Sequence, residues 1–201
     1  MMKFNYFAIS FMKKYLLSLI LFFFASNELF TNNEKKPNFL FVLVDDQPFD
    51  AVGFSGRYPF LKTPNIDKLA SEGVNIKNFF VTQSICSPSR ASFLTGTYPH
   101  MHGVNQNNRH VDPDWKNNIP YSVFLQENGY HTAHVGKIHM AHKRGVDHIR
   151  PGFDYWYSFI GQGDYFNPMV NDNGNEVQEK GYITDILTDK AVDWLTNKRD
   201  R

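Results

Sequence analysis

The chain has 201 residues, of which 42% are hydrophobic and 16% aromatic; this is enough apolar material for one sizeable core and argues against disorder. Its 21 Lys and Arg residues nearly balance its 20 Asp and Glu residues, so no field of the whole chain would attract nucleic acid or an anionic membrane surface. Any anion must therefore be bound locally, and we expect no nucleic-acid partner.

The first thirty residues have the pattern of a signal peptide. Lys13 and Lys14 precede an apolar run from Tyr15 to Ala25, and a polar stretch follows it. The run is too short for a stable membrane span, which needs about 20 residues in a helix. We therefore predict a cleaved signal peptide over residues 1–30, with Met12 as an alternative start, and export to the periplasm or the extracellular space.

After a linker over residues 31–36, strands and helices are predicted in alternation. Apolar runs predict strands over Phe39–Val44, Val74–Val81 and Tyr130–Val135, and apolar spacing with start and stop residues predicts helices over Thr63–Gly73, Ser87–Gly96, Tyr121–Asn128 and Thr184–Asn197. This alternation indicates an α/β fold with a largely parallel central sheet flanked by helices. Residues 105–118 and 144–179 show no clear period, and we predict ordered loops near a site there.

Two adjacent carboxylates, Asp45 and Asp46, close the first predicted strand. In open α/β sheets, ligands gather beyond the carboxyl ends of the strands. Carboxylate oxygens suit calcium or magnesium, and nothing nearby offers the Cys and His set that zinc prefers. The pair taken alone fits a turn or a helix cap equally well, so both interpretations stay open.

Cys86 is the single cysteine of the chain, so no internal disulfide can form. It precedes a predicted helix, at whose amino terminus free backbone N–H groups and the helix dipole favour negative charge. A free cysteine is usually a small buried hydrophobe, and a plain thiolate nucleophile is a second interpretation. The residues that follow, Ser87–Arg90 and then Thr95 and Gly96, argue against both.

The run CSPSRASFLTG, from Cys86 to Gly96, resembles the signature of the type I sulfatases, the formylglycine-dependent family of the alkaline-phosphatase-like superfamily. Other segments resemble the family in the same order. They are the metal-binding pair at Asp45 and Asp46, TPNIDxLAxEG at Thr63–Gly73, YPHxHG at Tyr98–Gly103 and GKxH at Gly136–His139. The resemblance implies that residues 37–201 are the amino-terminal portion of a sulfatase catalytic domain.

The resemblance also implies a mechanism. A maturation enzyme converts Cys86 to formylglycine, whose hydrate attacks the sulfur of a sulfate ester with help from a divalent cation. Calcium, with magnesium as the alternative, is implied at Asp45, Asp46 and residue 86. Arg90 would hold the nucleophile and offset nearby charge.

Lys137 would bind sulfate oxygens, and His139 would hydrogen-bond the nucleophile or the sulfate. These two residues lie two apart at the end of a predicted strand, so their side chains can share one face. The resemblance thus implies Cys86, Arg90, Lys137 and His139 as the catalytic set.

The predicted substrate is a sulfated small molecule or glycan, and the export signal and the aromatic loops favour a carbohydrate. Gln47 and the aromatic loops could line a sugar pocket, although Trp156 and Tyr157 fit a core role equally well. The alternatives are a phosphonate or phosphate monoester hydrolase of the same superfamily, a binding protein that kept the fold, and an inactive remnant. The family's second Asp with Asn or Gln, a further His and a further Lys are expected beyond Arg201, so we expect this fragment alone to be inactive.

Overall fold

The computed structural model describes residues 36–107, 111–140 and 148–198, so the predicted signal peptide lies outside the described residues. The chain divides into two units, one ending at Val44 and one beginning at Asp45, and each is described by itself. Within the described ranges, no helix combines the length and the apolar character needed to cross a bilayer.

The described part of the first unit, residues 36–44, has no regular secondary structure. The predicted strand over Phe39–Val44 is therefore wrong, and Leu40 and Val42 are each 73% exposed. A strand forms only where its backbone N–H and C=O groups find a neighbouring strand. No strand that the structure describes pairs with this segment. An apolar run favours burial, but it does not by itself provide a neighbouring strand.

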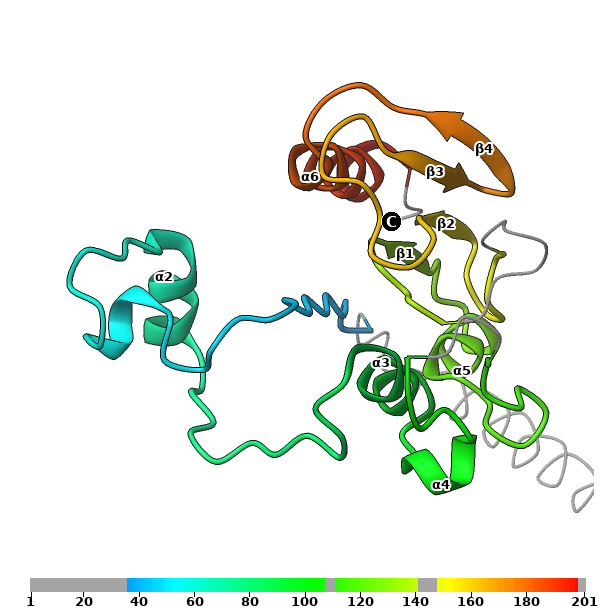
Figure 1. The fold of residues 1–201 in the computed structure, drawn as a ribbon, viewed down its shortest axis with the longest axis horizontal. Coiled ribbons are helices and arrows are strands. Elements are labelled where there is room, and N and C mark those ends of the chain that lie inside the picture. Colours follow the sequence, from blue (N-terminus) through cyan, green and yellow to red (C-terminus); the bar gives the residue numbers. More distant parts are fainter. Residues whose placement is uncertain (1–35, 108–110, 141–147, 199–201) are drawn as a thin grey trace, which may run out of the picture. The chain divides into compact units, whose positions relative to one another are not determined.

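The described helices of the second unit include all four predicted ones and two short helices, near residues 54 and 100, that were not predicted (Figure 1). They are η1 (Gly53–Ser55), α2 (Pro64–Glu72), α3 (Cys86–Thr95), α4 (Pro99–His102), α5 (Tyr121–Glu127) and α6 (Ile183–Asp193), which continues as the π-helical segment η2 (Trp194–Lys198). All four predicted helices are confirmed. Gly96 ends α3 with a left-handed φ of 67°, the conformation that glycine adopts most readily at a helix end.

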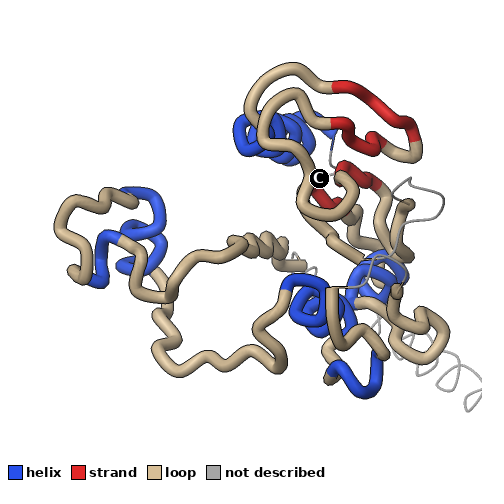
Figure 2. The backbone as a smooth tube through the Cα atoms, in the orientation of Figure 1, coloured by secondary structure: helices blue, strands red, loops and turns tan. Residues whose placement is uncertain are grey.

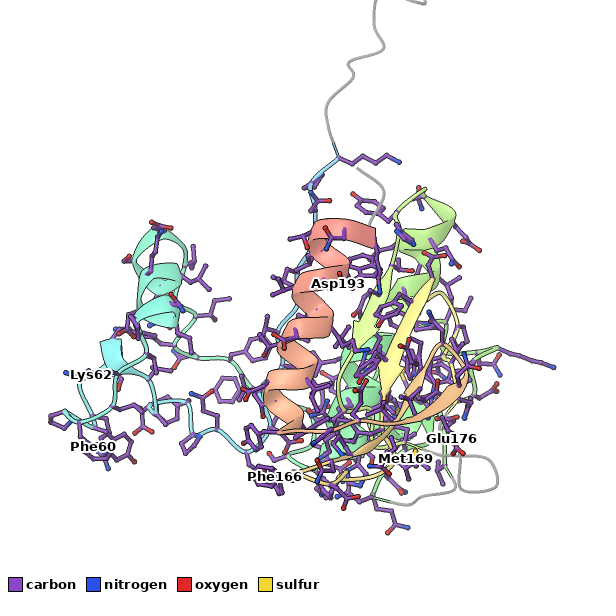
Figure 3. All side chains as sticks on the ribbon, turned by 90° about the horizontal axis from the view of Figure 1, so that it is seen from above. Phe60, Lys62, Phe166, Met169, Glu176 and Asp193 are labelled. Atoms are coloured by element: carbon purple, nitrogen blue, oxygen red, sulfur yellow. The ribbon has the colours of Figure 1, made fainter. Side chains whose placement is uncertain are left out.

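The described sheet has four strands in the order β1 (Ala133–Val135), β2 (Tyr155–Ser158), β3 (Met169–Asp172) and β4 (Asn175–Gln178). β1 and β2 pair in parallel, whereas β2 with β3 and β3 with β4 pair antiparallel. Figure 2 shows the strands in red. The α/β class is confirmed, but the sheet of the described residues is mixed rather than largely parallel. The main cause is a hairpin between β3 and β4 (Figure 3 labels Met169 and Glu176 on these strands). Its two-residue turn, Asn173 and Gly174, has φ angles of 50° and 92°, as a type I′ turn requires.

Two further predictions are corrected by the structure. Residues 74–81, predicted as a strand, have no regular structure, and Val74 and Phe80 are 87% and 86% exposed. The predicted loop over residues 144–179 instead contains β2, β3 and β4. Trp156 and Tyr157 on β2 are completely buried, so they belong to the core and not to a sugar pocket.

Two hydrophobic clusters form the core of the second unit from α3 onward. The first joins Ala91 and Leu94 of α3 to Ile138, Met140 and Trp156. The second joins β2 and β3 to α6, through side chains that include Tyr157, Val170 and Ile183. Because α3 and the segment after β1 share the first cluster, hydrophobic burial fixes the two segments that carry the predicted catalytic residues against each other.

Gly152 gives a test of this packing. It has a φ of 79°, and a Cβ there would lie 2.2 Å from the backbone N of Val123 in α5. Gly152→Ala should therefore destabilise the intact protein by about 3 kcal/mol, since overpacking and left-handed strain add. Gly129→Ala is the matched control, because its φ is 78° but nothing lies within 4 Å of the added Cβ. Denaturant unfolding would measure both, and equal losses would contradict the close approach at Gly152.

Candidate active site

Cys86 is the first residue of α3, as predicted. Ile85 before it is extended, and the Ser87 N–H, one of the first free N–H groups of the helix, donates to Asn107 Oδ1 at 2.9 Å. The Cys86 side chain is a partly exposed free thiol. The nucleophile candidate thus lies at the positive end of a helix dipole with its backbone held in place.

Arg90, one turn further along α3, connects two other segments to the helix. Its Nη1 donates to the Lys137 carbonyl oxygen at 2.7 Å, and its Nη2 donates to Asp45 Oδ2 at 2.8 Å. The side chain is only 11% exposed. Because a planar guanidinium can make both bonds at once, Arg90 fixes the carboxylate and the Lys137 backbone relative to each other.

The ammonium group of Lys137 lies beside the cysteine. Its Nζ is 2.9 Å from Asp45 Oδ2 and 3.7 Å from Cys86 Sγ, and it also donates to Gln162 Oε1. Asp45 Oδ1 lies 3.9 Å from the same sulfur. The structure therefore brings together four of the residues that the sequence singled out: Asp45, Cys86, Arg90 and Lys137.

This cluster carries two cations, Arg90 and Lys137, against the one carboxylate of Asp45. Partial burial of Asp45 disfavours its ionised form, but the hydrogen bonds from Lys137 and Arg90 outweigh burial and hold the pKa of Asp45 below its ordinary value. Asp45 is therefore ionised at neutral pH. Among these three side chains one positive charge remains in excess, which favours an anionic ligand.

His139 is joined to α3 through its backbone, because Ser87 Oγ donates to the His139 carbonyl oxygen. Its φ of 53° is left-handed, which is uncommon for a residue other than glycine. Lys137 and His139 do not lie in a strand, because β1 ends at Val135. Ile138 and Met140 are buried in the core, whereas Lys137 and His139 are only half-buried, so burial still alternates along this segment as expected for two side chains on one face.

The described residues do not by themselves fit a metal ion. Across residues 36–107, 111–140 and 148–198, no group of three or more His, Cys, Asp and Glu side chains is placed to hold one. Asp45 Oδ2 accepts from both Arg90 and Lys137, while Asp46 is exposed with a φ of 52° and has no hydrogen bond or ion pair to Cys86 in this part of the chain. Two carboxylates and residue 86 would also be too few ligands for calcium, which takes 6 to 8 oxygens.

Sequence reasoning missed two residues that reach the cluster. Gln162 contacts Lys137 from the loop between β2 and β3, and Asn107 contacts the amide of Ser87. Both lie in stretches predicted to be ordered loops near a site, and this prediction is confirmed for these two side chains. No motif marks them, although Gly161 and Gly163 on either side of Gln162 indicate a tight turn.

Comparison with known proteins decides the family of this site. The family model described as Sulfatase matches residues 37–201. The chain belongs to the sulfatase family. Its helix α3 with Cys86 and Arg90, and the segment with Lys137, all lie inside the matched region.

Individual sulfatases resemble the chain over most of its length. The N-acetylglucosamine-6-O-sulfatase of Bacteroides thetaiotaomicron is 36% identical over 167 residues, which cover 82% of this chain and 28% of that protein. The extracellular sulfatase SULF-1 homolog of Drosophila melanogaster is 28% identical over 177 residues, covering 84% of this chain and 15% of that protein. This chain therefore spans less than a third of the length of either sulfatase.

A solved sulfatase structure shares the fold. The structure of BT4656 in complex with its substrate D-glucosamine-2-N,6-O-disulfate superposes with a TM-score of 0.72 at 36% identity. The match covers 82% of this chain and 32% of that one. The chain thus has part of the alkaline-phosphatase-like α/β fold of the sulfatases.

Proposed function

We propose that the protein hydrolyses sulfate esters on carbohydrates, and that 6-O-sulfated glucosamine units are its substrate class. The observation that carries this proposal is the cluster around Cys86 at the start of α3: Lys137 Nζ lies 3.7 Å from its sulfur, and Asp45, 3.9 Å from the same sulfur, is bound by Arg90. The name of the Bacteroides relative and the substrate bound in the solved neighbour support the choice of sugar.

Residue 86 is the proposed nucleophile, after a maturation enzyme has converted Cys86 to formylglycine. One hydroxyl of hydrated formylglycine would attack sulfur and displace the alcohol of the ester, and the sulfate would remain bound to residue 86. Loss of the proton from the second hydroxyl would then re-form the aldehyde and release sulfate. The support in this chain is the family signature that begins at Cys86 and the position of its side chain at the positive end of α3.

Lys137 is proposed to bind the sulfate oxygens. Arg90 is proposed to hold Asp45 and the Lys137 backbone in fixed positions. Lys137 Nζ lies 3.7 Å from Cys86 Sγ, so the same ammonium can contact an oxygen on a sulfur atom under attack. Arg90 acts through its two bonds, which hold Asp45 and the Lys137 backbone. His139 is proposed to hydrogen-bond the nucleophile or the sulfate, from a segment that Ser87 ties to α3.

Calcium, with magnesium as the alternative, is proposed to bind at Asp45, Asp46 and residue 86. The basis is the family resemblance of the Asp pair and the preference of hard cations for carboxylate oxygens. Because the described side chains do not form a metal site, the proposal requires oxygen ligands in addition to these three.

Export to the periplasm or the extracellular space is proposed together with the domain boundaries. Residues 1–30 would be the signal peptide, with Met12 as the alternative start, and residues 31–36 a linker to the catalytic domain. The start of the family match at residue 37 and the name of the extracellular Drosophila relative support this organisation.

The test is an assay of the intact protein expressed with its maturation enzyme. We expect release of sulfate from N-acetylglucosamine-6-sulfate and from glucosamine-2-N,6-O-disulfate, and mass spectrometry should find formylglycine at residue 86. A clear preference for phosphate or phosphonate esters would contradict the proposal. An unmodified thiol at residue 86 in protein exported from its native host would instead favour a non-catalytic binding protein.

A further inference from the structure

Gln162 reaches the active site from a turn that is anchored in the core. Gly161 and Gly163 beside it have φ angles of 61° and 68°, and the Gly163 N–H donates to the Ile160 carbonyl oxygen at 3.0 Å. A Cβ on Gly163 would lie 2.5 Å from Cδ2 of Phe159, which is itself only 6% exposed. The turn therefore packs tightly against a core ring, and Gln162 projects from a fixed base.

Gln162 gives the Lys137 ammonium a second acceptor besides Asp45. An ammonium group has three N–H donors and no acceptor, so the side-chain oxygen of Gln162 must face it. Asp45 Oδ2 attracts Nζ from 2.9 Å, whereas Cys86 Sγ, at 3.7 Å, is a weak acceptor. Without Gln162, Asp45 would be the one strong acceptor among these three contacts, so the ammonium could turn about Asp45 and leave its position beside residue 86.

The neutrality of Gln162 matters as much as its position. A glutamate of the same length would bind Lys137 more strongly, because a charge-assisted bond with an ionised acceptor is stronger than one with an amide. It would also cancel the positive charge that Arg90 and Lys137 hold in excess over Asp45. An amide orients the ammonium and leaves the site attractive to an anion.

We propose that Gln162 is a neutral positioning residue of the sulfate site, which holds the Lys137 ammonium beside residue 86 without neutralising it. The inference rests on the proposed function and extends it to the loop between β2 and β3. Gln162 would thus contribute to sulfate affinity indirectly, by positioning Lys137.

Two variants of the intact protein separate position from charge. Gln162→Met removes the acceptor and should lower kcat about tenfold, since a hydrogen bond to a charged group is lost. Gln162→Glu keeps an acceptor but adds a negative charge, so the KM for the sulfate ester and the inhibition constant of inorganic sulfate should each rise about tenfold, with a smaller change in kcat. Asn167→Asp is the charge-matched control in the same loop, because its Oδ1 can still accept the Gly181 N–H.

A purely structural role for Gln162 makes a different prediction, because glutamate preserves the bond and would leave sulfate affinity unchanged. The protection of each variant against heat by inorganic sulfate gives a second measure of affinity that needs no turnover. If the wild type is active and Gln162→Glu has the same KM and the same sulfate affinity, the inference about Gln162 is wrong while the proposed function stands. A wild type that neither releases nor binds sulfate would overturn the proposed function, and the role of Gln162 with it.

Discussion

Cys86→Ala should abolish sulfate release while leaving the fold intact. The substitution removes the side chain from which formylglycine is formed, and loss of a nucleophile typically lowers kcat by about 10⁵-fold or more. The thiol is partly exposed and its contacts, at 3.7 Å from Lys137 Nζ and 3.9 Å from Asp45 Oδ1, are long. We therefore expect a loss of unfolding free energy of at most about 1 kcal/mol.

The matched control is Ser84→Ala, which truncates an exposed polar side chain two residues before the nucleophile. It should release sulfate at the wild-type rate. Sulfate release and thermal unfolding, measured on both variants of the intact protein, separate chemistry from folding. Turnover by Cys86→Ala near the wild-type rate would refute the role assigned to residue 86.

The helices could be predicted because their boundaries are local. Gly96 after α3 and Gly129 after α5 adopt the left-handed conformations that end a helix, and both are visible in the sequence. The strands depend on partners far away in the chain, so the apolar runs at Phe39–Val44 and residues 74–81 predicted strands where none forms among the described residues. One hairpin did carry a local indication that was missed, the Asn173 and Gly174 turn between β3 and β4.

Residues of the candidate site could be predicted only where they belong to a motif of fixed residue types at fixed spacing. Arg90 follows Cys86 by about one helical turn, so helix geometry places both residues on the same side of α3. The bonds from Arg90 and Lys137 to Asp45 join segments that the sequence separates widely, so family resemblance rather than spacing connected them. Gln162 has no motif, and although the glycines on either side of it indicate a turn, only its contact with Lys137 shows where its side chain points.

Arg90→Ala should lower kcat/KM for sulfate release by about 10³-fold. Each hydrogen bond to a charged group contributes about 1.5–3 kcal/mol, and this substitution removes two, one to Asp45 and one to the Lys137 carbonyl. It also leaves the Asp45 carboxylate with Lys137 as its remaining cationic partner in the cluster. We expect Asp45 and the Lys137 backbone to lose their fixed relative position, which lowers kcat as well as sulfate affinity.

Arg90→Lys distinguishes geometry from charge at the same position. A lysine keeps the positive charge, but one compact ammonium cannot reproduce the planar two-point contact with Asp45 and the Lys137 backbone. Its kcat/KM should therefore stay at least about tenfold below wild type, which corresponds to about 1.4 kcal/mol of transition-state stabilisation. Arg57→Ala is the control, because Arg57 is 67% exposed in a 3.7 Å pair with Asp50 and should leave sulfate release unchanged. Wild-type kcat/KM in Arg90→Lys would show that charge alone is sufficient, and that the bond between α3 and the segment after β1 does not position the sulfate site.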